Sequence, residues 1–269
     1  MNNFRRDIIP TRHIAIIFLV TFFMVMLIGV MLMRFLDQKF VLLAEVFIVI
    51  PAYVYVRYKH FSVKRVFRLN AISLRMGILS FFIAVSTIVI TDEMDRTLRS
   101  FFPIPSWWQD AMKAVVEIQT IGDGIIIILA AVLLAGVAEE MIFRGLLQRS
   151  LEYERDPFLA VVLSAVFFAL VHFNPWTALQ ITFLGLVLGY LSWKSKSIYP
   201  AVLLHALNNL VSIVVLNLDS ADLSIYAGRI HVKYYWVLLA IFVLLFSLWG
   251  FNRESERFYH NGGFRNEDW

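Results

Sequence analysis

Cysteine is absent from the 269-residue sequence, and charged residues make up only 16% of it. The lack of cysteine excludes disulfides and metal sites built from thiolates. The scarcity of charge excludes an ordinary soluble domain, in which about a quarter of the residues are charged. Hydrophobic residues account for 60% of the chain, and the mean hydropathy is +0.73. The sequence is therefore suited to a lipid environment.

Long apolar runs take the place of charge. A helix needs roughly 20 apolar residues to cross the hydrocarbon core, and by this measure we expect about eight transmembrane helices. Their expected ranges are about 14–33, 40–56, 72–90, 121–147, 157–173, 176–192, 199–217 and 235–251. The gaps are too short for a soluble core, and the period-two alternation of a membrane β-barrel is absent. The sequence predicts an all-α fold, a polytopic membrane helical bundle formed by a single domain over residues 1–269.

Basic residues indicate the orientation. Arg5, Arg6 and Arg12 precede the first apolar run, which is longer than a secretory signal core and lacks a cleavage site, so we expect a retained span. With the N-terminus inside, most of the 24 Lys and Arg residues fall in cytoplasmic segments, above all in the loop 57–75. This bias predicts both termini in the cytoplasm of a multi-pass protein of the plasma membrane. We interpret the basic loop as an anchor at anionic lipid head groups, with a docking site for an acidic partner as the alternative.

Ionisable side chains interrupt the apolar runs at a few positions, where they are expensive and usually functional. Glu139, Glu140 and Arg144 follow a long uncharged stretch. Glu140 and Arg144 are four residues apart, so on a helix they share a face and can pair. Glu139 is rotated by about 100° from Glu140 and is left free to point elsewhere.

Two later spans carry further polar residues. His205 and Asn209 are four residues apart and share a helix face. A hairpin turn predicted at 152–157 brings Glu139 and His172 to the same height, about 15 Å below the cytoplasmic boundary at the helical rise per residue. His205 comes to a similar depth by the same measure. A carboxylate, two imidazoles and an amide are therefore expected to converge within the bundle.

Helix packing is the alternative for each of these residues taken singly, because a histidine or an ion pair can simply link neighbouring membrane helices. Their convergence favours a functional site. Glu45 is not part of such a group of polar residues, and we interpret it as a packing or gating residue outside the site. Gln180 and Asn208 are interpreted as packing residues or as supports of the site.

Three stretches together resemble the signature of the CPBP family of intramembrane proteases. That family includes eukaryotic CAAX prenyl endopeptidases and bacterial bacteriocin-processing and self-immunity proteins. The stretches are Glu139-Glu-Met-Ile-Phe-Arg144, Phe168-Ala-Leu-Val-His172 and His205-Ala-Leu-Asn-Asn209, and they match the family pattern in order. The resemblance covers about residues 121–217, where we expect the catalytic core.

The resemblance implies hydrolysis of a peptide bond within the membrane. The catalytic residues that it implies are Glu139, Glu140, Arg144, His172, His205 and Asn209. Glu139 would be the general base, acting on a water shared with His172. Two versions of the site stay open. In one, Zn²⁺ is held by Glu139, His172 and His205. In the other, no metal is bound and His205 and Asn209 donate hydrogen bonds to the oxyanion.

The expected partners are a membrane-associated peptide or protein substrate and the lipid bilayer, and no nucleic acid is expected. The alternative function is that of a non-catalytic membrane adaptor or immunity protein that binds a partner membrane protein or peptide. Binding alone has no need of a base, two imidazoles and an amide, so the set of motifs favours the protease.

Overall fold

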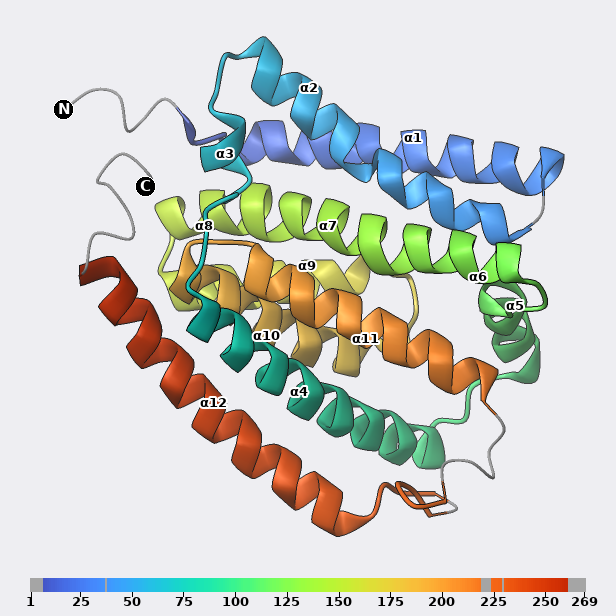
Figure 1. Ribbon diagram of the computed structural model, residues 1–269. Helices are drawn as coiled ribbons and strands as arrows, with labels where there is room; N and C mark the ends of the chain where they lie inside the picture. Colours follow the sequence, from blue (N-terminus) through green and yellow to red (C-terminus); the bar gives the residue numbers. More distant parts are fainter. Residues whose placement is uncertain (1–6, 37, 219–223, 229, 261–269) are drawn as a thin grey trace.

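The computed structural model describes residues 7–36, 38–218, 224–228 and 230–260 (Figure 1). Arg5 and Arg6 lie outside the described residues. Within the described part the chain is helical almost throughout, with a single isolated β-bridge between Ala227 and Val232. The predicted all-α fold is confirmed.

The helices follow one another with short connections. They are α1 (Thr11–Phe35), η2 (Gln38–Val49), α2 (Ile50–Tyr58), α3 (Val63–Val66), α4 (Leu74–Phe101), α5 (Ser106–Val116), α6 (Ile121–Ile127), η3 (Ile128–Leu134), α7 (Ala135–Glu140), η4 (Met141–Gln148), α8 (Arg149–Glu154), α9 (Pro157–Leu170), α10 (Ala178–Ser195), α11 (Tyr199–Asn217) and α12 (Tyr234–His260). The turns of η2 are 3-10 helical, and those of η3 and η4 are π-helical. The segments from α6 to α8 run without a break, and we call Ile121–Glu154 the central helix.

Six helical segments of the described chain are long and apolar enough to cross a membrane. They are Thr11–Phe35, Gln38–Tyr58, Leu74–Phe101, Ile121–Glu154, Tyr199–Asn217 and Tyr234–Phe258. The other two predicted spans are also helices, α9 and α10, but they are not among the six. With 14 residues, α9 is about 21 Å long, which is less than the thickness of the hydrocarbon core. The protein is an integral, multi-pass helical membrane protein.

α4 is longer than the span predicted at 72–90, because it continues through a charged stretch that a hydropathy window does not register. Two ion pairs between residues four apart support the extension: Arg96–Asp92 at 3.0 Å and Arg99–Asp95 at 2.6 Å. The aromatic stretch that follows leads into α5, which has no buried residue and packs against η2 and α11.

The hairpin turn predicted at 152–157 is present. The Asp156 carboxylate accepts hydrogen bonds from the backbone N–H groups of Phe158 and Leu159, and Pro157 occupies the first turn of α9. The next turn at the same end of the bundle closes through Lys196, whose φ of 50° ends α10.

The central helix lies in the middle of the bundle. Figure 1 shows it between α1 and α2 on one side and α9 and α11 on the other, and contacts of its segments with η2, α9, α10 and α11 agree. α12 packs along α4 on the far side. In this position residues 138–150 of the central helix are buried or half-buried, whereas Leu133, Leu134 and Val137 are exposed.

Two glycines let backbones approach the central helix or its neighbours closely. A Cβ atom at Gly145 would lie 2.7 Å from Cα of Phe67, in the loop between α3 and α4. A Cβ atom at Gly185 of α10 would lie 3.1 Å from Cα of Ala165 in α9. Neither backbone has room for a larger side chain at these contacts.

Candidate active site

The polar residues of the first motif lie where the winding of the central helix changes. α7 is a short α-helical stretch between the π-helical η3 and η4. Long π-helical stretches are rare, and π-helical turns occur frequently at functional sites. Glu139 and Glu140 end α7, and Arg144 lies in η4. Their exposed fractions are 8%, 0% and 0%, so all three side chains are enclosed by the bundle.

Arg144 is held on three sides. Its Nη1 lies 3.1 Å from Oε1 of Glu140, which is the pair expected from their spacing. Its Nη2 donates a hydrogen bond to the Gly185 carbonyl at 3.3 Å, and the guanidinium carbon lies 4.3 Å from the centre of the Phe168 ring. A fully buried carboxylate requires such a partner, because removing either charge leaves the other uncompensated.

His205 joins the same carboxylate from α11. Its Nδ1 lies 2.8 Å from Oε1 of Glu140, and its exposed fraction is 4%. Because an ionised carboxylate only accepts hydrogen bonds, Nδ1 is the donor in this contact. The sequence did not predict this bond, since no spacing rule links residues on different helices. Glu140 thereby fixes the imidazole so that its Nε2 is the nitrogen closer to Glu139.

Glu139 is the carboxylate of this group that lacks a hydrogen-bond partner. Its Oε2 lies 3.9 Å from Nε2 of His205, which is too long for a hydrogen bond. No described protein group makes a hydrogen bond with that oxygen. Buried polar atoms are nearly always bonded in proteins, and exceptions call for an explanation. We call Glu139, Glu140, Arg144 and His205 the site cluster.

Asn209 is one helical turn beyond His205 and reaches the central helix. Its Nδ2 donates a hydrogen bond to the Ala131 carbonyl at 2.8 Å. Asn208 contributes a longer contact from Nδ2 to Oδ1 of Asn209, at 3.5 Å. Asn209 is therefore held beside the site cluster, with one amide N–H group committed to the backbone and a second one left over.

His172 lies at the edge of this arrangement. It belongs to the turn that follows α9, and its side chain is exposed. Its Nδ1 is 2.7 Å from the Phe168 carbonyl, and its ring packs on the Phe168 ring with centroids 4.7 Å apart. The Phe168 ring also packs on His205 at 5.8 Å. No contact with Glu139 occurs among the described interactions of His172, so the shared water stays a prediction.

The three residues considered as zinc ligands are Glu139, His172 and His205. Among the described residues, no three His, Cys, Asp or Glu side chains are grouped so that they could hold a metal ion. A catalytic zinc site requires about three protein ligands around one point. The donor set in this arrangement does not fit such a site, and we derive no step through a metal.

Glu45 lies closer to the site cluster than its lack of a motif suggested. It is carried by η2, which packs against α7 and η3. Glu45 was predicted to lie outside the site, because the residues near it in the sequence match none of the three motifs. The contacts of η2 with α7 place its helix beside the site cluster.

A second charged group lies at the end of the central helix, and we call Arg68, Gln148, Glu152 and Lys196 the terminal cluster. Arg68 donates two hydrogen bonds to the Glu152 carboxylate, one of them at 3.0 Å. Gln148 donates a third at 2.8 Å, and Nζ of Lys196 lies 3.8 Å from Oε2 of Glu152. Burial, together with the neighbouring Arg68 charge, lowers the pKa of Lys196 to about 8.

The basic loop is thus partly engaged within the protein. Arg68 pairs with Glu152, and Nε of Arg65 lies 2.8 Å from Oδ2 of Asp7. These two cations tie the loop to the central helix and to the start of the chain. Anchoring at lipid head groups stays a prediction for the basic residues of the loop.

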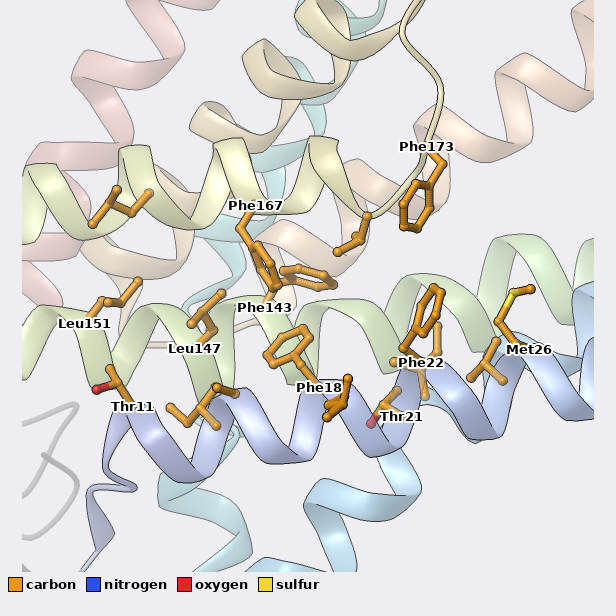
Figure 2. A pocket seen from close by; sticks show the side chains of 17 residues that line it. Thr11, Phe18, Thr21, Phe22, Met26, Phe143, Leu147, Leu151, Phe167 and Phe173 are labelled. Carbon is orange, nitrogen blue, oxygen red and sulfur yellow. The ribbon is translucent and has the colours of Figure 1, made fainter.

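An apolar cavity of about 730 Å³ lies between α1 on one side and η4 and α9 on the other (Figure 2). Its lining includes Phe18, Phe143 and Phe167 but no charged residue. The Phe143 ring packs edge-on against Phe168, with centroids 5.0 Å apart, and Phe168 in turn contacts the site cluster. The cavity and the cluster are thus separated by aromatic rings, and the groups able to act as acids or bases lie on the cluster side.

Residues 121–211 match the family model described as type II CAAX prenyl endopeptidase Rce1-like. The match covers about a third of the chain, and it includes all six residues predicted to be catalytic. It confirms the resemblance of this part of the chain to the CPBP and CAAX protease family. No curated protein and no solved structure matches the chain.

Proposed function

We propose that the protein is an intramembrane endopeptidase of the plasma membrane that hydrolyses a peptide bond of a membrane-associated peptide or protein. The observation that carries the proposal is Glu139, a buried carboxylate whose Oε2 has no hydrogen-bond partner among the described residues. An ionisable residue in an apolar bundle is costly and usually serves a function. The match of residues 121–211 to a family of endopeptidases supports the same conclusion.

Glu139 acts as the general base in this proposal. It takes a proton from a water molecule, whose oxygen attacks the carbonyl carbon of the scissile bond. The C–N bond then breaks, and the proton passes from Glu139 to the leaving nitrogen. A positioned base of this kind typically contributes about 10²–10⁴-fold to the rate. Glu140 also has an Oε2 atom without a hydrogen-bond partner among the described residues, but its Oε1 contacts both Arg144 and His205 and its side chain is fully buried, so we assign the role of the base to Glu139.

His205 and Asn209 are proposed to stabilise the tetrahedral oxyanion. Protonated His205 donates from both ring nitrogens, with Nδ1 toward Glu140 and Nε2 toward the substrate. Asn209 has one N–H group left after its bond to the Ala131 carbonyl. Donors aimed at a developing oxyanion are each worth about 10²–10³ in kcat. His172 completes the proposal as a second group on the attacking water.

The test is the isosteric substitution Glu139→Gln, which keeps the shape of the side chain and removes the base. The measurement is cleavage of palmitoylated peptides with randomised positions by purified protein in liposomes, with products sequenced by mass spectrometry. We expect cleavage to fall by at least about 100-fold while the variant accumulates in membranes like the wild type. The zinc content of both preparations is measured alongside, and about one equivalent in the wild type would favour the metal version of the site.

The matched control is Glu154→Gln on the last turn of the central helix, whose carboxylate only accepts long hydrogen bonds from Thr11 at 3.3–3.4 Å. This variant should cleave like the wild type. Undiminished cleavage by Glu139→Gln would contradict the mechanism. A wild-type protein that cleaves no peptide would favour the non-catalytic adaptor.

A further inference from the structure

Buried cationic side chains occur at four places among the described residues, and three of the four have a carboxylate partner. The three pairs are Lys39–Asp123 at 2.8 Å, Arg68–Glu152 at 3.0 Å and Arg144–Glu140 at 3.1 Å. The fourth cation is Arg149, whose exposed fraction is 9%. Its Nη1 donates a hydrogen bond of 2.7 Å to the Asp7 carbonyl, and it forms no ion pair with a described residue. A neutral carbonyl does not offset a buried charge, so Arg149 requires an anion.

Two carboxylates lie near Arg149, and each of them already has a cation. Asp7, whose carbonyl accepts the bond from Arg149, has its carboxylate 2.8 Å from Nε of Arg65. Glu152, three residues further along the same helix, accepts two hydrogen bonds from Arg68. The charge of Arg149 is therefore left without a carboxylate of its own in the described part of the chain.

The guanidinium group of Arg149 is accessible to a ligand. It carries five N–H donors in a planar fork, and the Asp7 carbonyl uses one of them. Its Nε and Nη2 make no hydrogen bond with the described residues, yet neither belongs to the enclosed polar atoms that lack a partner. An anion can therefore reach these two nitrogens, and a fork of this kind binds phosphate or carboxylate oxygens in pairs.

Arg149 lies at the expected level of the membrane surface. Ten residues separate it from Glu139, which corresponds to about 15 Å of helix and reaches the expected cytoplasmic boundary. The segment that contains Asp7 leads into α1, on which Ile16 and Val20 are exposed. Anionic lipid head groups of the cytoplasmic leaflet attract basic side chains at this level. A lipid whose phosphate reaches Arg149 can place its acyl chains along α1.

We propose that Arg149 binds the phosphate group of an anionic phospholipid in the cytoplasmic leaflet. Nε and Nη2 donate hydrogen bonds to two phosphate oxygens, while Nη1 keeps its bond to the Asp7 carbonyl. Arg65, which is paired with the Asp7 side chain, adds positive charge beside the site. The site is independent of the proposed protease function, and Arg149 lies outside the basic loop 57–75.

The experiment measures the binding of lipids to the full-length protein in detergent by native mass spectrometry. Phosphatidylglycerol and phosphatidylcholine with identical acyl chains are compared, and we expect the wild type to bind phosphatidylglycerol about tenfold more tightly. Arg149→Gln should lose this preference, and Arg149→Lys, which keeps the charge without the fork, should retain part of it. The matched control Arg155→Gln removes an exposed positive charge near the same end of the helix and should bind both lipids like the wild type.

Four results would contradict the proposal. Two of them are equal binding of the two lipids by the wild type and an unchanged preference in Arg149→Gln. An equal loss of preference in Arg155→Gln would show general attraction to the membrane instead of a site. Inorganic phosphate that raises the unfolding temperature as much as phosphatidylglycerol does would show that the site takes a free anion.

The chain itself is a further source of negative charge, because Glu267 and Asp268 follow the described residues in the sequence. The double variant Glu267→Gln with Asp268→Asn should keep the lipid preference and the unfolding temperature of the wild type. If it lowers the unfolding temperature as much as Arg149→Gln does, the chain supplies the anion and the lipid assignment is wrong.

A second measurement does not depend on the folding of a variant. A phosphatidylglycerol analogue with a photoreactive diazirine in its head group is crosslinked to the wild type, and the labelled peptides are identified by mass spectrometry. We expect the label around Asp7, Arg65 and Arg149, and we expect phosphatidylglycerol, but not phosphatidylcholine, to compete with it. Label confined to other segments would overturn the proposal.

Discussion

The two charged clusters of the central helix differ in how their carboxylates are satisfied. In the terminal cluster, Glu152 accepts hydrogen bonds from Arg68 and Gln148 and lies near Lys196. In the site cluster, Oε2 atoms of both Glu139 and Glu140 have no partner among the described residues. The same helix thus carries one carboxylate whose two oxygens both accept hydrogen bonds and two carboxylates that each keep an oxygen without a hydrogen-bond partner among the described residues.

This difference distinguishes a carboxylate that holds parts of the fold together from a carboxylate that can take part in a reaction. A paired carboxylate such as Glu152 fastens the loop between α3 and α4 to the end of the central helix. The Oε2 atom of Glu139 accepts no hydrogen bond from the described residues, and this carboxylate is proposed to act on water and substrate. We therefore expect substitutions in the terminal cluster to lower stability and substitutions of Glu139 to lower activity. Substitution of Arg144 is expected to lower both stability and activity.

The largest expected effect comes from Arg144→Met. The change leaves Glu140 buried without its cation, which costs about 3–5 kcal/mol for a fully buried pair. We expect a sharp drop in the amount of protein in membranes and in the unfolding temperature of the purified protein. The double variant Arg144→Met with Glu140→Gln removes both charges and should recover much of the stability but not the cleavage. A double variant that is no more stable than Arg144→Met would show that the ion pair is not the cause.

A smaller effect is expected from Glu152→Gln, which leaves Arg68 and Lys196 without their carboxylate. Removing one partner from a buried hydrogen-bond network costs about 1–3 kcal/mol. The unfolding temperature should fall, while cleavage per folded molecule stays at the wild-type level. If Glu152→Gln lost as much cleavage per folded molecule as Glu139→Gln does, the distinction between the two clusters would be wrong.

The smallest effect concerns the pH dependence of stability through Lys196, whose pKa of about 8 in the folded protein lies below its ordinary value of 10.5. Between these two values the unfolded chain binds the proton that the folded protein has released, so the contribution of Lys196 to stability rises with pH. We expect the difference in unfolding temperature between the wild type and Lys196→Met to shift in favour of the wild type as pH increases from about 8 to about 10. A difference between the two proteins that stays constant over this range would contradict the depressed pKa.

Local spacing rules predicted the parts of the site that lie within one helix. The pair Glu140–Arg144 follows from a separation of four residues, and the turn at Asp156–Pro157 follows from capping chemistry. The hydropathy pattern located each of the eight helices, but it ended α4 too early. Ion pairs such as Arg96–Asp92 continue a helix beyond the apolar stretch that a hydropathy window detects.

Contacts between helices were beyond these rules. Nothing in the spacing of residues indicates that His205 bonds to Glu140, or that Asn209 bonds to the Ala131 carbonyl. The height of His172 could be estimated from the hairpin turn, but the direction of its side chain could not. In the structure that side chain is exposed, and its ring nitrogen lies against the Phe168 carbonyl. Lateral placement depends on side-chain packing across several elements at once.

The absence of a side chain at Gly145 has a consequence for comparing related chains. A Cβ atom there would lie within 3.0 Å of three backbone atoms of Phe67, and backbone cannot swing aside as a flexible side chain does. In this packing the position following Arg144 accepts only glycine. Among relatives that keep the first motif, a glycine at this position therefore marks chains whose loop can lie on the helix as it does here. A larger residue marks chains in which the loop has moved, even where every motif residue is identical.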